Sequence, residues 1–283
     1  MTERLADVTA RITGMHQLGA VVGAMRGIAA ARAQQARTQL AAVDSYAAAI
    51  AAGIGRAMAI MPPGETARAN VATKPGVVLF CAEQGFAGAF SERIIDAARA
   101  DIGKAALFAV GTRGIATLAE RGIATVWTGA MPAQSLLIPK FADRIAEALY
   151  ARIATGEIDR LDVVFTHWIV GHGAEILRRR LFPLDMALFP PRIDRSPPLL
   201  NLPPATLLAE FTAEHVHAQL CHAALHAFAA ENEARLEAMA AAQREVQRRM
   251  GELESTQRQV RQEEITAEIV ELTAGAPPSL PGR

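Results

Sequence analysis

The feature that most constrains this chain is a proline-free stretch, Thr206 to Gly275, in which apolar residues return every seven positions. Ala, Glu, Gln, Arg and Leu dominate it, and these residues are strong helix formers. A seven-residue repeat with a narrow apolar stripe is typical of a coiled-coil seam. At 1.5 Å per residue, the helix would be roughly 100 Å long, so it would project from a domain of this size and need a partner helix. The predicted seam contains Met239, Val246, Leu253 and Val260.

A second heptad pattern runs from Leu5 to Met61 and ends at Pro62-Pro63-Gly64. It is sustained over about eight heptads, and Arg26 alone interrupts its two apolar rows. Because the two helices stand at opposite ends of the chain, pairing them gives an antiparallel coiled coil. Its N-terminal seam contains Val22, Val43 and Ile50, and Gly14, Gly19, Gly23 and Gly27 predict close approach of the partner helix.

Polar residues interrupt the C-terminal seam. Gln243 and Gln257 stand at positions where the repeat calls for apolar side chains. We expect the seam to loosen there and the helix to run alone toward its end.

The middle of the chain alternates short apolar runs with helical patterns. The runs predict strands at residues 77–81, 106–110, 123–127, 161–168 and 175–182, and helices are expected from Phe90, after Gly111 and over 134–154. This alternation predicts a mostly parallel, Rossmann-like α/β domain inserted between the two long helices. The fold class is therefore α/β with a long antiparallel coiled coil. The expected boundaries are 1–61 for the first helix, 70–205 for the α/β foot, 206–275 for the second helix and 276–283 for a flexible tail.

Composition excludes several classes of function. The 283 residues carry no net charge, which argues against a nucleic-acid-binding protein. No window of about 18 uncharged apolar residues occurs, so we expect contact with a membrane only through partners. Cys81 and Cys221 are too few and too far apart for a disulfide framework or a zinc site. The run Arg178-Arg179-Arg180 predicts a solvated face.

Two sequence patterns could indicate a nucleotide-binding or metal-binding site, but each has a simpler structural explanation. Gly85-Phe86-Ala87-Gly88 follows a strand, but lacks the third glycine or the Lys-Ser/Thr of a nucleotide loop, so we interpret it as a tight turn. The cluster His215, His217, His222 and His226 lacks an obvious carboxylate or cysteine to complete a metal site, and predicts solvated or inter-helix histidines. We therefore predict no catalytic residue, cofactor or metal. Two alternatives stay open, namely a Rossmann-like enzyme with a coiled-coil dimerisation arm and a metal-binding scaffold.

Four segments resemble the gamma subunit of F-type rotary ATP synthases. Residues 261–276, RQEEITAEIVELTAGA, resemble the family ending R-Q-x-x-I-T-x-E-L-x-E-I-x-x-G-A, and 231–242 resemble its S-E-x-A-A-R-M-x-A-M-x-x-A segment. Residues 24–32 are similar to K-A-M-x-M-V-A-A-x-K, and 83–88 stand where the family has D-R-G-L-C-G. The resemblance covers nearly the whole chain. Two lysines of the N-terminal motif are missing and Ala87 replaces a cysteine, which indicates a divergent branch.

The resemblance implies a non-catalytic rotor shaft that couples transmembrane ion flow to ATP synthesis or hydrolysis on other subunits. Its partners would be the alpha and beta subunits of the catalytic head, the epsilon subunit and the membrane c-ring. It also implies that Arg261, Gln262 and Thr266 contact a loop of a catalytic subunit, and that Arg26 makes a charged contact with the same ring. The expected location is peripheral, at the cytoplasmic face of a bacterial inner membrane.

Overall fold

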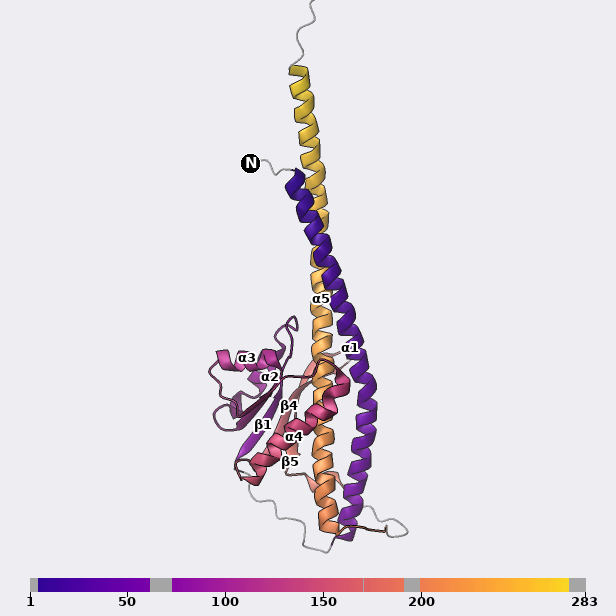
Figure 1. Cartoon of the computed structure of the whole chain (residues 1–283), viewed down its shortest axis with the longest axis vertical. Helices are drawn as coiled ribbons and strands as arrows, with labels where there is room; N and C mark the ends of the chain where they lie inside the picture. The colour runs from indigo at the N-terminus through magenta and orange to yellow at the C-terminus, as the bar shows by residue number, and fades with distance from the viewer. Residues whose placement is uncertain (1–4, 62–72, 170, 191–198, 275–283) are drawn as a thin grey trace, which may run out of the picture. The chain divides into compact units, whose positions relative to one another are not determined.

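The computed structural model describes residues 5–61, 73–169, 171–190 and 199–274 (Figure 1). These residues divide into two compact units: a larger one within 29–236, and a smaller one formed by 5–28 with 237–274. Two long helices, α1 (Leu5–Ile60) and α5 (Pro204–Ala274), contribute to both units. The helices begin and end within two residues of the positions that the heptad patterns predict. The predicted tail, 276–283, lies outside the described residues.

The larger unit is built on one five-stranded sheet with the order β3-β2-β1-β4-β5. Its strands are β1 (Pro75–Phe80), β2 (Ala106–Val110), β3 (Trp127–Gly129), β4 (Arg160–Ile169) and β5 (Gly173–Phe182). All neighbours are parallel except β4 and β5, which pair antiparallel and place β5 at the sheet edge. The predicted fold class is thus confirmed.

The third predicted strand, 123–127, is wrong in position, because β3 begins only at Trp127. The backbone N–H of Ile123 donates to the carbonyl of Leu118 at 2.9 Å, so this apolar residue closes the preceding helix. Gly122, with φ of 67°, makes the turn that directs the chain back. Apolar character alone could not separate a helix-closing residue from the start of a strand.

Three shorter helices cover the sheet: α2 (Phe90–Ala97), α3 (Thr112–Glu120) and α4 (Ile138–Ala154). The prediction of a helix from residue 134 is four residues early for α4. A 3-10 turn, Ser135–Leu137, precedes α4, and Pro139 lies in its first turn, where a missing N–H breaks no helical hydrogen bond.

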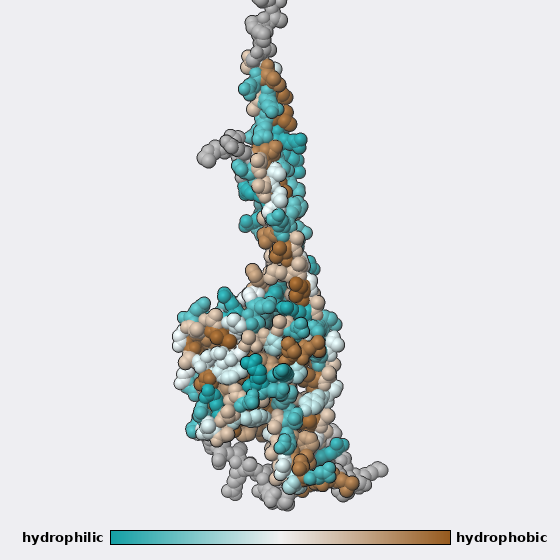
Figure 2. All heavy atoms as spheres, viewed as in Figure 1, coloured by the Kyte–Doolittle hydropathy of each residue, from teal (hydrophilic) through white to brown (hydrophobic). Residues whose placement is uncertain are grey.

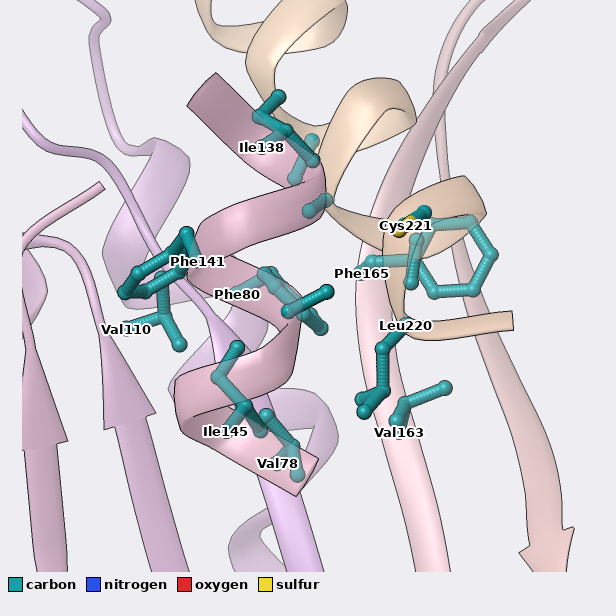
Figure 3. Close-up of a cluster of buried hydrophobic side chains, with 14 of the residues drawn as sticks. Val78, Phe80, Val110, Ile138, Phe141, Ile145, Val163, Phe165, Leu220 and Cys221 are labelled. Carbon is teal, nitrogen blue, oxygen red and sulfur yellow. The ribbon is translucent and has the colours of Figure 1, made fainter. Parts of the chain in front are cut away.

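Two hydrophobic clusters fill the two faces of the sheet. Strand residues alternate between them, since Val78 and Phe80 of β1 belong to one cluster and Val77 and Leu79 to the other. α4 and α5 cover the first face, where Phe141 and Leu220 meet the sheet side chains (Figure 3). α2 and α3 cover the second face. The sheet is therefore buried on both sides, as a mostly parallel sheet requires.

The smaller unit is an antiparallel pair of helix segments. Gln257 donates to the hydroxyl of Thr9 at 3.0 Å, while Gly19 faces Val246 further along, where an added Cβ would lie 3.4 Å from a valine methyl. The contact at Gln257 corrects the expectation that the helix runs alone there. Close approach at a glycine occurs at Gly19, whereas nothing lies within 4 Å of a Cβ added to Gly14, Gly23 or Gly27.

In the part of the chain that the structure describes, none of the helices combines the length and apolar character needed to cross a bilayer.

Candidate functional site

The last fourteen described residues of α5, 261–274, form an uncovered helical end. Every one of them is exposed. Ile265, Ile269 and Leu272 recur at i, i+4 and i+7 and therefore share one side of the helix, with 50%, 56% and 76% of their surface exposed. Figure 2 shows hydrophobic side chains among hydrophilic ones on this segment. No described part of the chain covers this amphipathic helical end, and exposed apolar faces of this kind are typical of surfaces that bind other proteins.

Three residues predicted to contact a partner lie on this end. Arg261, Gln262 and Thr266 are all exposed, and the Thr266 hydroxyl donates to the carbonyl of Gln262 at 2.8 Å within the helix. At Leu5, the first described residue of α1, the backbone N–H lies 3.4 Å from the Glu264 carboxylate of α5. The structure therefore leaves these side chains available to another molecule.

A second exposed apolar strip lies on α1. Leu18, Val21 and Ile28 have 48%, 56% and 54% of their surface exposed, and Arg26 is exposed beside them on the same helix. Sequence analysis missed this strip because it followed only the two rows of the seam. The signal was present, since these three apolar residues belong to neither row.

The predicted seam residues divide by burial. Val22, Met239, Val246 and Val260 are buried, with at most 8% of their surface exposed. In the larger unit, Val43 packs against the first core cluster and is half-buried, as is Ile50. Leu253 is half-buried and lines a cavity of about 660 Å³ in the smaller unit, together with Gly14 and Met15. The pairing is thus tight near Val246 and open near Leu253.

In nucleotide-binding proteins of this fold class, a phosphate binds at the carboxyl edge of the sheet. Here a carboxylate of the chain itself, Glu83, occupies that edge. Glu83 follows β1, and its carboxylate accepts hydrogen bonds from the N–H of Thr112 at 2.9 Å, the Thr112 hydroxyl at 2.7 Å and the N–H of Met131 at 2.8 Å. Thr112 begins α3, whose N-terminus attracts anions. Gly111 makes this approach possible, because a Cβ there would lie 2.4 Å from the carbonyl oxygen of Cys81.

A buried carboxylate from α5 holds the adjoining loop. Glu231 accepts from the N–H groups of Glu83 and Gln84, each at 3.0 Å, and it pairs with Arg235. Arg235 also donates to Asn232 at 2.9 Å and to the carbonyl of Gly85 at 3.3 Å. Sequence analysis assigned no role to this pair, although the spacing of Glu231 and Arg235, four residues apart on a helix, is the spacing of an ion pair.

The tight turn predicted at residues 85–88 comes directly after the loop that Glu231 holds. Phe86 and Gly88 both have φ of 62°, a left-handed conformation that a turn requires and that is uncommon for phenylalanine. The N–H groups of Glu83 and Gln84, just before this turn, are not free to bind a phosphate, since they already donate to Glu231.

His217 and His222 lie between helices, as predicted: His217 reaches the carbonyl of Pro139 at 3.2 Å and Asp143 at 3.0 Å, both on α4, and His222 lies near Asp44 of α1. His222 and His226 also pack against β4 at the ring of Phe165. The Nε2 atoms of His222 and His226 lie 3.1 Å apart, and the rings of His226 and His167 are 4.4 Å apart. A carboxylate is also present, because Asp44 lies 3.5 Å from Nε2 of His222. Burial lowers the pKa of His222 to about 4 and that of His226 to about 3, so both are neutral at pH 7.

Within the described residues, no group of three or more His, Cys, Asp or Glu side chains is arranged to hold a metal ion. Burial raises the pKa of Cys81 and of Cys221 to about 12, so both thiols stay protonated and unreactive at neutral pH.

Comparisons with known proteins agree over nearly the whole chain. The family model described as ATP synthase matches residues 4–277. The ATP synthase gamma chain of Chlorobium luteolum is 28% identical over 286 residues, covering 96% of this chain and 97% of that protein. The gamma chain of Moorella thermoacetica is 27% identical, covering 96% and 98%. This chain belongs to the ATP synthase gamma family.

Solved structures of ATP synthases share the gamma-family fold. The Euglena gracilis mitochondrial ATP synthase rotor aligns with a TM-score of 0.64 at 12% identity, covering 92% of this chain and 98% of that one. A chain of the Tetrahymena thermophila mitochondrial ATP synthase central stalk and c-ring aligns with a TM-score of 0.56 at 13% identity, covering 78% and 99%. At these identities the likeness concerns the fold alone.

Proposed function

We propose that this gamma-family chain is the central-stalk rotor shaft of a rotary ATP synthase, and that it couples ion flow to ATP synthesis or hydrolysis on other subunits. The observation that carries the proposal is the uncovered end of α5, residues 261–274, whose exposed apolar side chains face no described part of the chain. A shaft needs such an end, because it must bind a ring of other subunits while its own fold stays intact.

The chain itself has no catalytic role in this proposal. Glu83 and Glu231 accept from the backbone N–H groups of Glu83, Gln84 and Thr112, at the sheet edge where a nucleotide phosphate would bind. An incoming phosphate would have to displace a carboxylate that accepts three hydrogen bonds. The alternative of a Rossmann-like enzyme predicts the opposite, since it needs these donors free.

The proposed partners are the alpha and beta subunits around α5, together with epsilon and the c-ring. Support comes from the related structures, which are described as a rotor and as a central stalk with a c-ring. Bacterial relatives support a location at the cytoplasmic face of the inner membrane, held there through the other subunits.

Reconstitution of the complex tests the shaft. We expect the triple variant Arg261→Ala, Gln262→Ala, Thr266→Ala to lower coupled ATP synthesis at least about tenfold, because it removes the polar contacts proposed for this end. Arg258→Ala, at an exposed position of the same helix, is the matched control and should retain normal synthesis. Equal synthesis rates for the triple variant and the control would refute the contact.

A binding measurement on the full chain separates the shaft from the enzyme. ATP and dinucleotides should leave its melting temperature unchanged. A saturable rise in melting temperature on adding either ligand would favour the enzyme.

A further inference from the structure

A small apolar cavity of about 110 Å³ lies in the larger unit, between α4, β4, β5 and α5. Leu161, at the start of β4, belongs to its lining, so the cavity lies at the end of the sheet opposite the edge that Glu83 occupies. Leu149, Leu161 and Val216 form its deeply buried part, each with at most 3% of its surface exposed. Tyr150 and Ala209 are exposed and form its mouth.

Only two side chains of the lining carry polar atoms, and both already have acceptors. The Tyr150 hydroxyl donates to the carbonyl of Ala213 at 3.3 Å, and the Thr212 hydroxyl donates to the carbonyl of Leu208 at 2.7 Å. None of the buried side-chain polar atoms that lack a partner in the described chain belongs to this lining. A buried water needs several polar partners, so the cavity favours an apolar occupant.

The size of the cavity suits one aromatic ring. An apolar cavity of roughly 150 Å³ in another protein stays dry and binds benzene. The cavity between α4 and α5 is somewhat smaller, but it is open at Tyr150 and Ala209, so a substituent on a bound ring can extend outward. A ring in this space would regain the dispersion contacts that the apolar lining lacks while the cavity is empty.

The mouth of the cavity adjoins an acidic groove. This groove has a volume of about 590 Å³ and shares Tyr150 and Ala213 with the cavity. Asp143, Glu147 and Glu214 line it and are all exposed, and no Lys or Arg is among the described residues of its lining. A molecule whose ring lies in the cavity would therefore place its substituent next to carboxylates.

Contacts inside the groove leave most of its negative charge in place. Tyr46 donates to Glu214, but a neutral hydroxyl does not cancel the charge of the carboxylate. Asp143 lies 3.0 Å from Nε2 of His217. Glu147 forms no ion pair with any described residue.

The charge of Glu214 acts at the mouth of the cavity. Burial raises the pKa of the Tyr150 hydroxyl, and the negative charge of Glu214 raises it further. Lys140 and Arg144, on the same helix as Tyr150, lie outside the lining of the groove, and they are fewer than its three carboxylates. A cation at the mouth is therefore favoured over an anion.

We propose that this cavity binds the ring of a small aromatic amine, with the ammonium group in the acidic groove beside Glu214. The apolar lining holds the ring and the carboxylates select the charge of its substituent. The proposal is independent of the rotor function, because it uses no residue of the exposed end of α5.

Three probes that share a ring and differ in charge test the site, namely benzylamine, benzyl alcohol and benzoate. Each is titrated into the full chain at pH 7 and low ionic strength, and binding is followed by saturation-transfer NMR. We expect benzylamine to bind saturably with a Kd of about 1 mM, the range for a ligand of this size. Benzyl alcohol should bind more weakly, and benzoate most weakly.

Variants of the lining locate the bound probe. Ala209→Leu places a larger apolar side chain at the mouth and should weaken benzylamine binding at least about tenfold. Ala213→Val narrows the cavity from the same helix and gives a second variant in case the first misfolds. Ala241→Leu makes an equal change at an exposed alanine of α5 outside the lining, and it is the matched control.

Glu214→Gln tests the charge of the mouth. We expect it to weaken benzylamine about threefold, the effect of losing an exposed ion pair, and to leave benzyl alcohol unchanged. Saturable binding that Ala209→Leu weakens and Ala241→Leu preserves supports the site. No saturable binding of benzylamine, equal effects of Ala209→Leu and Ala241→Leu, or tighter binding of benzoate than of benzylamine would overturn the proposal.

Discussion

Two regions of one helix, α5, show how differently the same secondary structure can be stabilised. In the larger unit, residues 216–236 are almost continuously buried or half-buried and belong to the two core clusters. In the smaller unit, residues 261–274 are exposed without exception. Their sequences are both rich in helix formers, so propensity does not separate them. The difference teaches that the first region specifies the fold of this chain, whereas the second is available for other chains.

The largest expected effect comes from the buried ion pair of the first region. Arg235→Ala leaves the Glu231 carboxylate buried without its charge partner, and we expect the free energy of unfolding to fall by about 3–5 kcal/mol. Urea denaturation followed by circular dichroism measures the change. Arg261→Ala, in the exposed region, should change stability by less than about 0.5 kcal/mol. Comparable losses in the two variants would break the distinction between the regions.

Truncating one apolar side chain in each region compares their contributions to stability again, and the expected loss is smaller than that for Arg235→Ala. Leu220→Ala removes a fully buried side chain and should cost about 2–4 kcal/mol. Ile269→Ala, with its side chain exposed, should leave the unfolding free energy of the isolated chain within about 0.5 kcal/mol of the original. In the assembled complex Ile269→Ala should also lower stability, because the Ile269 side chain is then expected to be covered by a partner. Calorimetric melting of both forms provides the measurement.

Lowering the pH should reduce the free energy of unfolding of the first region, because two of its half-buried histidines resist protonation. The pKa values of His222 and His226, about 4 and 3, lie below the value of about 6.5 expected when the chain is unfolded. Between these values the unfolded chain binds protons that the folded chain does not, so stability falls as pH decreases from about 6.5 toward 3. Burial is the main cause for both groups. His222 adds repulsion at His226, Arg179 and His167 add repulsion at both, and Asp44 partly opposes the shift at His222.

The double variant His222→Gln, His226→Gln tests this pH dependence. We expect it to remove about 2 kcal/mol of the loss in stability between pH 6.5 and pH 4, after allowance for partial solvent screening. Denaturation midpoints at several pH values measure the difference. An unchanged pH slope would show that other groups are responsible.

A small gain in stability is expected from two glycines of the smaller unit. Nothing lies within 4 Å of a Cβ added at Gly251 of α5, so Gly251→Ala should gain about 0.5–1 kcal/mol from the reduced backbone entropy of the unfolded chain. Gly23→Ala on α1 meets the same condition and should behave alike. Thermal melting measures both changes. A loss of stability in either variant would mean that its glycine is needed for contact within the chain.

Heptad periodicity predicted the long helices well, because a repeat sustained over many turns leaves few alternatives. The strands with strong apolar runs, such as β2, were also predictable. The position of β3 was not, because Ile123 serves to close a helix. The polar arrangement was the least predictable part. Glu83, Glu231 and Arg235 meet only after folding, and neighbouring arginines of β5 acquire different partners according to where the sheet edge directs them.

The contact between Leu5 and Glu264 has a mechanical consequence. Within the smaller unit, the segments of α1 and α5 that pack together resist twisting, because torsion would have to shear their shared seam. Beyond Glu264 the described part of α5 continues for about ten residues, roughly 15 Å, with no described residue of α1 beside it. In the smaller unit, torsion is therefore expected to deform the single helix beyond Glu264 more readily than the paired segment before it.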